Sequence, residues 1–137
     1  MRQETQEVSD KHEDVAGCPV LIVSTDREFV SHYRGMLVPL GIQPITATTS
    51  EAALAVLRLT VVAFVVVDQE IGTFDTRRIL QRARKTQLHA PILVITRQPD
   101  PYLRREALAL GAAAYLNHPV LRDDIVYALV KSKPLGR

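Results

Sequence analysis

The sequence has one cysteine and no tryptophan among its 137 residues, and it has no long apolar run. A single thiol, on Cys18, cannot form a disulfide within the chain, so a hydrophobic core has to hold the fold together. A chain of this length can bury such a core as one domain. No apolar run approaches the roughly 18 residues of a membrane span, and the N-terminus lacks the apolar core of a secretory signal. We therefore expect a cytoplasmic protein that does not enter a membrane.

A marked excess of charge of either sign is also missing. The chain has 17 Lys and Arg against 15 Asp and Glu, for a formal net charge of +2. Such a small surplus does not by itself indicate a nucleic-acid partner. The arginine-rich stretch at 74–87 also lacks the interleaved aromatic residues of a nucleic-acid-binding surface. The four histidines show no metal-ligand spacing. We expect no direct nucleic-acid partner, no metal site and no cofactor.

Apolar periodicity divides the chain into tails and one folded domain. Residues 1–17 are acidic and carry almost no apolar pattern, which predicts a disordered N-terminal tail. Residues 134–137 form a short C-terminal tail, which leaves 18–133 as the domain. Within the domain, short β-branched runs alternate with segments of helical spacing. Strands are predicted at 19–24, 42–47, 61–68, 91–96 and 113–117, and helices at 26–41, 49–59, 74–87, 100–111 and 121–133.

This alternation predicts right-handed βαβ units and a doubly wound α/β fold with a parallel sheet. The first, third and fourth strands have the strongest apolar runs, so we place them at the centre. Pro44 favours a position near an edge for the second strand. In such a sheet, ligands bind at the carboxyl ends of the central strands. The candidate site residues therefore lie at the strand ends or just after them: Ser24, Thr25, Asp26, Asp68, Thr96, Arg97, Asn117 and His118.

Three landmarks at these strand ends carry a resemblance to a known family. Asp68 ends the third strand, Thr96 ends the fourth, and the stretch "GAAAYLNHP" at 111–119 ends the fifth. From about Pro19 to Lys133 the chain thereby resembles the receiver domain of bacterial two-component response regulators. The resemblance implies a flavodoxin-like fold, in which five helices cover a five-stranded parallel sheet of order 2-1-3-4-5.

The same resemblance implies a chemistry for these residues. In receivers, the aspartate at the Asp68 position accepts a phosphoryl group from the phosphohistidine of a kinase, and two acids after the first strand help it to hold Mg²⁺. A hydroxyl at the Thr96 position and a lysine at the His118 position contact the phosphoryl oxygens, which carry negative charge. Tyr115 resembles the switch aromatic of the family. The implied partner is a histidine kinase or another signalling protein.

The sequence departs from the receiver pattern at charged positions. Ser24 and Thr25 stand where the acid pair is expected, and His118 stands where the lysine is expected. Arg97 stands where a small residue normally leaves room for the phosphoryl group. The losses are mutually consistent, because a lysine in a poorly solvated pocket without its acids is costly, whereas a histidine can stay neutral.

These departures bear directly on metal binding. One aspartate rarely holds Mg²⁺ without further carboxylates or substrate phosphates. Asp26 comes one position late and suits a helix N-cap better than a metal ligand. Glu70 is acidic, but its family position usually supplies a backbone carbonyl. We therefore expect Mg²⁺ binding to be weak or absent.

Several interpretations of individual side chains stay open. Asp68 either starts a loop and caps local backbone, accepts a phosphoryl group, or forms a structural ion pair with Arg97 or His118. Thr96 is either a strand-end hydroxyl or a retained switch residue. His118 is either a packed loop histidine or a functional group, and Tyr115 either switches or simply packs.

The leading hypothesis is a stand-alone, receiver-like signalling module with a degenerate phosphoacceptor site. It keeps Asp68, lacks the acid pair and the lysine, and acts by protein–protein interaction without conventional phosphorylation, rather than as an enzyme. The alternative is a genuinely phosphorylated response regulator with Asp68 as the phosphoacceptor. A flavodoxin-like flavin-binding protein is a remote alternative, because the "STDREF" loop lacks the glycine that close backbone approach to a phosphate needs.

A homodimer is considered through helix 100–111, strand 113–117 and helix 121–133, a surface that receivers often use. The spacing of Ile125 and Val126 indicates that the final helix mostly faces the sheet. Exposed apolar area on this surface is expected at Tyr102, Leu103, Leu110, Tyr127 and Val130.

Overall fold

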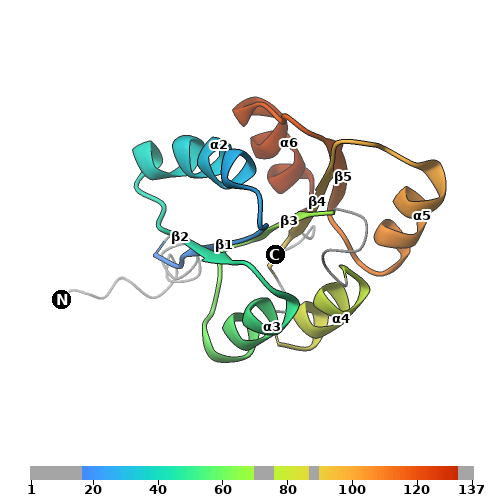
Figure 1. Cartoon of the computed structure of the whole chain (residues 1–137), viewed down its shortest axis with the longest axis horizontal. Coiled ribbons are helices and arrows are strands. Elements are labelled where there is room, and N and C mark those ends of the chain that lie inside the picture. Colours follow the sequence, from blue (N-terminus) through green and yellow to red (C-terminus); the bar gives the residue numbers. More distant parts are fainter. Residues whose placement is uncertain (1–16, 70–75, 87–89, 133–137) are drawn as a thin grey trace.

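The computed structural model of the chain describes residues 17–69, 76–86 and 90–132. A parallel sheet of five strands lies at its centre, in the order β2-β1-β3-β4-β5 (Figure 1). The predicted α/β class and strand order are confirmed, with β1, β3 and β4 inside the sheet and β2 at an edge. The strands are β1 (Val20–Val23), β2 (Pro44–Ala47), β3 (Val65–Asp68), β4 (Ile92–Thr96) and β5 (Ala114–Asn117).

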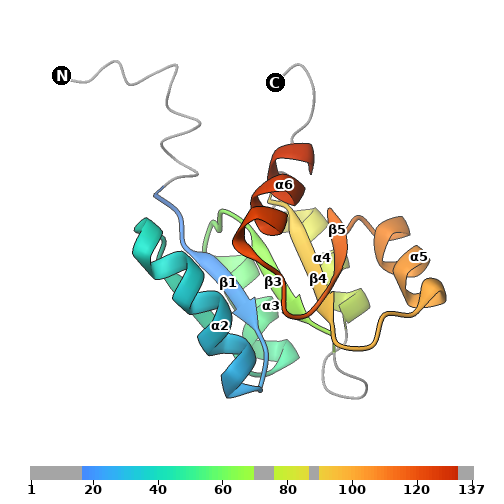
Figure 2. The ribbon, with the colours of Figure 1, turned by 90° about the horizontal axis from the view of Figure 1, so that it is seen from above.

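Helices cover both faces of the sheet, as a doubly wound fold requires. Helices α2 and α6 lie over one face, and α3, α4 and α5 lie over the other (Figures 1 and 2). Each face has its own cluster of buried apolar side chains, one around Phe29 and Ile95 and the other around Leu57 and Leu80. The helices are α2 (Arg27–Leu37), α3 (Ser50–Leu59), α4 (Thr76–Thr86), α5 (Pro101–Ala109) and α6 (Arg122–Ser132).

Local sequence sets both ends of α2, the helix nearest the candidate residues. The Asp26 side chain accepts a hydrogen bond from the Glu28 backbone N–H and so caps the helix, as predicted. Helix α2 ends at Leu37, because Pro39 cannot continue the α-helical hydrogen bonds and lies in a single 3-10 turn instead. Gly41, with φ of 81°, then turns the chain towards β2 in a conformation that favours glycine.

The predicted third strand is too long. Its apolar run covers 61–68, but β3 forms only at Val65–Asp68. Neighbouring strands explain the shortening, since β1 starts at Val20 and β4 at Ile92, and β3 pairs with them only from its residue 65 onwards. An apolar run therefore overstates a strand wherever it extends past its partners.

The buried face of α6 also differs from the prediction. Ile125 and Ala128 are buried, whereas the side chain of Val126 is 48% exposed. Leu129 is partly buried against the same cluster as Ile125. The helix thus turns a narrower apolar stripe to the sheet than its composition indicates.

Some predictions concern residues outside the described part of the chain. These are the N-terminal tail, except Gly17, the C-terminal tail at 134–137, and the role of Glu70. Within the described ranges, no helix combines the length and apolar character needed to cross a membrane.

Candidate functional site

Three buried polar side chains mark the carboxyl edge of the sheet. Ser24 follows β1, Asp68 is the last residue of β3, and Thr96 is the last residue of β4. Their exposed fractions are 0%, 1% and 5%, which is unusual for polar groups unless they are hydrogen-bonded. The edge predicted for a binding crevice therefore carries the buried polar groups of this core.

Both carboxylate oxygens of Asp68 are engaged by the chain itself. The Ser24 hydroxyl donates to Asp68 Oδ2 at 2.7 Å. The Arg97 guanidinium donates to Asp68 Oδ1 through a longer contact of 3.4 Å. Ser24 is held in turn, because the backbone N–H of Asp26 donates to its hydroxyl oxygen at 2.9 Å. A hydroxyl and a cation thus satisfy a carboxylate that water hardly reaches.

Arg97 joins two acids rather than one. Its second terminal amino group contacts Asp26 Oδ2, and its first contacts Asp68 Oδ1. The guanidinium carbon also lies 5.7 Å from the centre of the Phe29 ring, within cation–π range. About a third of the Arg97 side chain is exposed, so solvent reaches the cation although it hardly reaches Asp68. An ion pair of Asp68 with either Arg97 or His118 was considered from the sequence, and the structure contains the pair with Arg97.

His118 also packs against the Phe29 ring. It follows β5 and stacks on Phe29, with ring centres 5.2 Å apart. Its Nδ1 is 2.9 Å from the Tyr33 hydroxyl. That hydroxyl accepts the Val120 backbone N–H at 3.2 Å, which leaves its own hydrogen for Nδ1 of the histidine. The arrangement suits a neutral His118 that carries its proton on Nε2.

Burial and charge support the same protonation state. Burial lowers the pKa of His118 below its usual value of 6.5, and the charge of Arg97 and the neighbouring His32 lower it further. Burial also raises the pKa of the Tyr33 phenol to about 12, so this hydroxyl keeps its hydrogen at neutral pH. The position therefore presents no positive charge at pH 7.

The sequence from residue 20 to residue 130 matches the family described as the response regulator receiver domain. The chain belongs to this family. No curated protein matches the sequence. With the family established, the two acids and Arg97 occupy the part of a receiver domain where the resemblance places the phosphoacceptor chemistry.

Solved structures give the same fold for this receiver domain. It resembles a response regulator from Burkholderia pseudomallei crystallised with a phosphorylated aspartic acid, calcium ion and citrate (TM-score 0.75, 23% identity, covering 82% of this chain and 66% of that one). This chain thus spans just under two thirds of that protein. It also resembles a CheY-like receiver domain from Methanospirillum hungatei JF-1 (0.73, 20%, covering 84% and 95%). An orphan response regulator of H. pylori is a further neighbour (0.70, 14%, covering 85% and 96%).

The oxygen ligands at this edge do not fit the Mg²⁺ site that the family implies. Magnesium requires a near-octahedral set of oxygens, usually with more than one carboxylate. Here the acid-pair positions hold Ser24 and Thr25, and the carboxylates of Asp26 and Asp68 both face the Arg97 guanidinium. In the described part of the chain, no cluster of three or more His, Cys, Asp or Glu could hold a metal ion.

Thr96, Tyr115 and Thr25 have partners or surroundings other than Asp68. Thr96 Oγ1 accepts the Gln98 backbone N–H at 3.1 Å, which stabilises the turn after β4. The Tyr115 hydroxyl accepts the backbone N–H of Asp100, the N-cap of α5, at 3.2 Å. Tyr115 therefore ties β5 to the start of α5. Thr25 is exposed and lines a groove beside α2.

The predicted apolar interface is only partly exposed. Tyr102, Tyr127 and Val130 have exposed fractions of 68%, 66% and 64%. Leu110 packs against the core beneath α5, and Leu103 is also partly buried. These two leucines therefore offer less exposed apolar area than the other three side chains.

Sequence reasoning missed the aromatic side of the site. Phe29, His32 and Tyr33 from α2 surround His118, and the His32 ring lies edge-on to it with centres 5.5 Å apart. His32 Nε2 also lies 3.0 Å from the Val120 carbonyl oxygen. The available signal was the spacing of Phe29 and Tyr33, four residues apart on one helical face with His32 beside them.

Proposed function

We propose that this receiver domain acts by contact with a protein partner, without conventional phosphorylation of Asp68. The observation that carries the proposal is Arg97, whose guanidinium joins Asp68 to Asp26. A charge that belongs to the chain thus neutralises the carboxylate that receivers leave to a metal. The partner is a histidine kinase or another signalling protein, as the family implies.

Phosphoryl transfer to Asp68 needs charge stabilisation that this site supplies poorly. Negative charge spreads over three phosphoryl oxygens, and metal ions and fixed cations normally neutralise it. His118 hydrogen-bonds to Tyr33 as a neutral ring and adds no cation. Asp68 would also have to exchange its contacts with Ser24 and Arg97 for contacts with the phosphoryl donor.

One observation favours the alternative, a response regulator phosphorylated on Asp68. The contact between Arg97 and Asp68 is long, at 3.4 Å, and the arginine side chain is 32% exposed. A guanidinium is a good ligand for phosphoryl oxygens. On this alternative, Arg97 turns from Asp68 to a phosphoryl group attached to it.

A flavin-binding role has less support. A phosphate at the start of α2 would use free backbone N–H groups there. The N–H groups of Asp26 and Glu28 already donate to Ser24 Oγ and Asp26 Oδ1. The family match at residues 20–130 points to a receiver instead.

The proposal includes weak or absent Mg²⁺ binding, and titration calorimetry tests it. We expect no saturable heat when Mg²⁺ is added to the wild type at about millimolar concentration. The matched control is Asp68→Asn, which removes the buried carboxylate charge and keeps the side-chain shape. Tight binding to the wild type that disappears in Asp68→Asn would contradict the proposal.

A further inference from the structure

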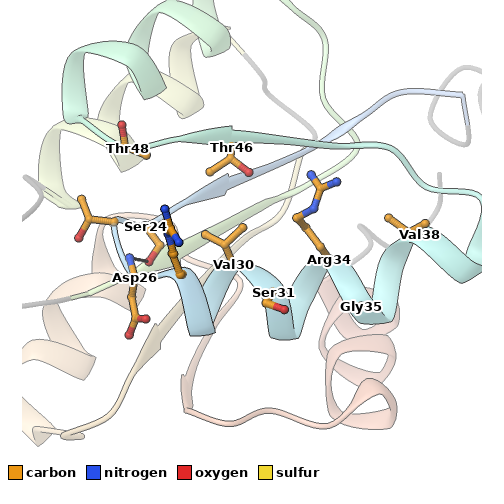
Figure 3. Close-up of a pocket in the computed structure, with 11 residues that line it drawn as sticks. Ser24, Asp26, Val30, Ser31, Arg34, Gly35, Val38, Thr46 and Thr48 are labelled. Atoms are coloured by element: carbon orange, nitrogen blue, oxygen red, sulfur yellow. Dashed lines mark hydrogen bonds between the residues drawn. The ribbon is translucent and has the colours of Figure 1, made fainter.

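A groove with a volume of about 720 Å³ lies between α2 and the edge strand β2 (Figure 3). Val30 and Val38 form its apolar side on α2, and Thr46 and Thr48 line it from β2 and the residues after it. β2 is an edge strand that pairs only with β1. Helix α2 does not cover Thr46 on this strand, and that side chain is exposed. An uncovered edge of this kind commonly receives another segment of chain.

Two arginines give the groove its charge. Arg27 and Arg34 both line it, and Figure 3 shows Arg34 pointing from α2 towards β2. Seven residues apart, they lie two helical turns from each other, about 10 Å along the axis. Across residues 17–69, 76–86 and 90–132, neither takes part in an ion pair. The one acid in the lining, Asp26, contacts Arg97. The groove is therefore suited to an acidic occupant.

The chain itself carries an acidic segment before β1. Within residues 1–16, acids recur at every third position and one more follows them: Glu4, Glu7, Asp10, Glu13 and Asp14. Residues 17–19 connect the segment to Val20, the first residue of β1, and Val20 pairs with Pro44 at the start of β2. Sixteen residues reach up to about 50 Å when extended, while α2 is only about 16 Å long. The segment is long enough to follow the whole groove.

We propose that the acidic segment 1–16 docks in the groove between α2 and β2, with its carboxylates on Arg27 and Arg34. An extended chain with three residues per turn brings every third side chain to one face, about 9 Å apart. This period matches the spacing of the two arginines. The docked segment covers the β2 edge and lies against the loop of Ser24 and Asp26, which also borders Asp68. The proposal does not depend on whether Asp68 is phosphorylated.

Paramagnetic relaxation in the full chain tests the docking. A nitroxide is attached at Ser9→Cys in a Cys18→Ser background, and amide intensities are compared between oxidised and reduced label. We expect the amides of Arg34, Thr46 and Thr48 to be roughly halved in intensity or weaker. Amides of α5, which packs on the opposite face of the sheet, should keep theirs.

Charge-matched variants decide whether the arginines hold the segment. Arg27→Gln with Arg34→Gln should restore the groove intensities, and high salt should do the same because it screens exposed ion pairs. Arg104→Gln with Arg105→Gln removes the same charge from exposed positions on α5 and should leave the broadening unchanged. Amide dispersion in each spectrum verifies folding. Broadening that is absent, spread over all faces, or unaffected by the groove variants would overturn the proposal.

Discussion

Arg97 and Ser24 together engage both oxygens of a carboxylate that is 1% exposed. At the scale of single residues, this explains how Asp68 stays in the core without the acid pair and lysine of the receiver pattern. A buried charge without partners is strongly destabilising, whereas a charge with a cation and a hydroxyl donor is tolerated. Two of the residues that depart from the receiver pattern, Ser24 and Arg97, therefore stabilise the Asp68 carboxylate together.

Removing the cation should expose this dependence. Arg97→Ala removes the cation that contacts Asp68 Oδ1, so we expect the free energy of unfolding to fall by about 1–3 kcal/mol. Urea denaturation measures it. Asp68→Asn should recover part of the loss when added to Arg97→Ala, because the neutral amide needs no cation. An Arg97→Ala effect no larger than that of the exposed Arg104→Ala would contradict this account.

The environment of His118 predicts a pH dependence of stability. Its pKa in the folded chain is lowered, first by burial and then by Arg97 and His32, while Asp68 and Asp26 oppose the shift. In the unfolded chain it returns towards about 6.5. Below that pH the unfolded state binds the proton more readily, so the folded state loses stability as the pH falls towards the folded pKa.

A comparison of the wild type with a variant that cannot titrate at this position isolates the contribution of His118 to the pH dependence of stability. Between about pH 7 and pH 5, urea denaturation of the wild type should lose more stability than that of His118→Asn, which cannot titrate. The two proteins share all other ionisable groups. Identical pH profiles would show that His118 is not held neutral by its surroundings.

The residues at the strand ends could be located from sequence, but their partners could not. Asp68 and Thr96 were identifiable because each ends an apolar run. The roles of Phe29 and Tyr33 depend on which part of the α2 stripe meets the chain after β5, and this is set by tertiary packing. The long Arg97 side chain likewise reaches Asp26, 71 residues away in sequence.

At the scale of elements, the length of a strand depends on the strands with which it pairs, whereas the ends of a helix depend on the local sequence. Apolar runs predicted each strand, but only pairing shows that β3 begins at Val65. Helix ends were more predictable, since Asp26 and Thr49 cap α2 and α3 through their own side chains. Composition could not show that Val126 faces outwards, because several stripes of α6 are apolar.

Alanine substitutions at two glycines, Gly111 and Gly35, are predicted to change the stability of the fold in opposite directions. Gly111 has φ of +107°, and a Cβ there would lie 2.9 Å from Arg84 Cδ, so Gly111→Ala should destabilise by about 1 kcal/mol or more. Gly35 lies within α2, and a Cβ there would have no neighbour within 4 Å. Gly35→Ala should therefore stabilise, by up to about 1 kcal/mol. Thermal unfolding compares the two, and equal effects would contradict the assigned backbone conformations.

At the scale of the whole molecule, α5 and α6 each carry exposed apolar side chains. Tyr102, Tyr127 and Val130 are each more than 60% exposed. We expect them to support self-association of the receiver domain, because exposed apolar surface can mark a site where a protein partner binds. Of the five side chains expected to be exposed here, these three are exposed, whereas Leu103 and Leu110 are partly buried.

Sedimentation velocity tests this surface with matched variants. Tyr127→Ser with Val130→Ser should shift the chain towards the monomer at concentrations where the wild type associates. Leu59→Ser with Val61→Ser removes side chains that are 74% and 68% exposed on another part of the molecule, and it should have no effect. Equal effects of the two pairs, or a wild type that stays monomeric, would contradict the expectation.

The central claim is that Asp68 persists without the machinery for its phosphorylation, and intact mass after treatment with a small phosphodonor and Mg²⁺ tests it most directly. We expect the wild type to keep its mass, as Asp68→Ala does, because Arg97 and Ser24 engage the carboxylate and His118 adds no charge. The addition of one phosphoryl group to the wild type, absent from Asp68→Ala, would contradict it.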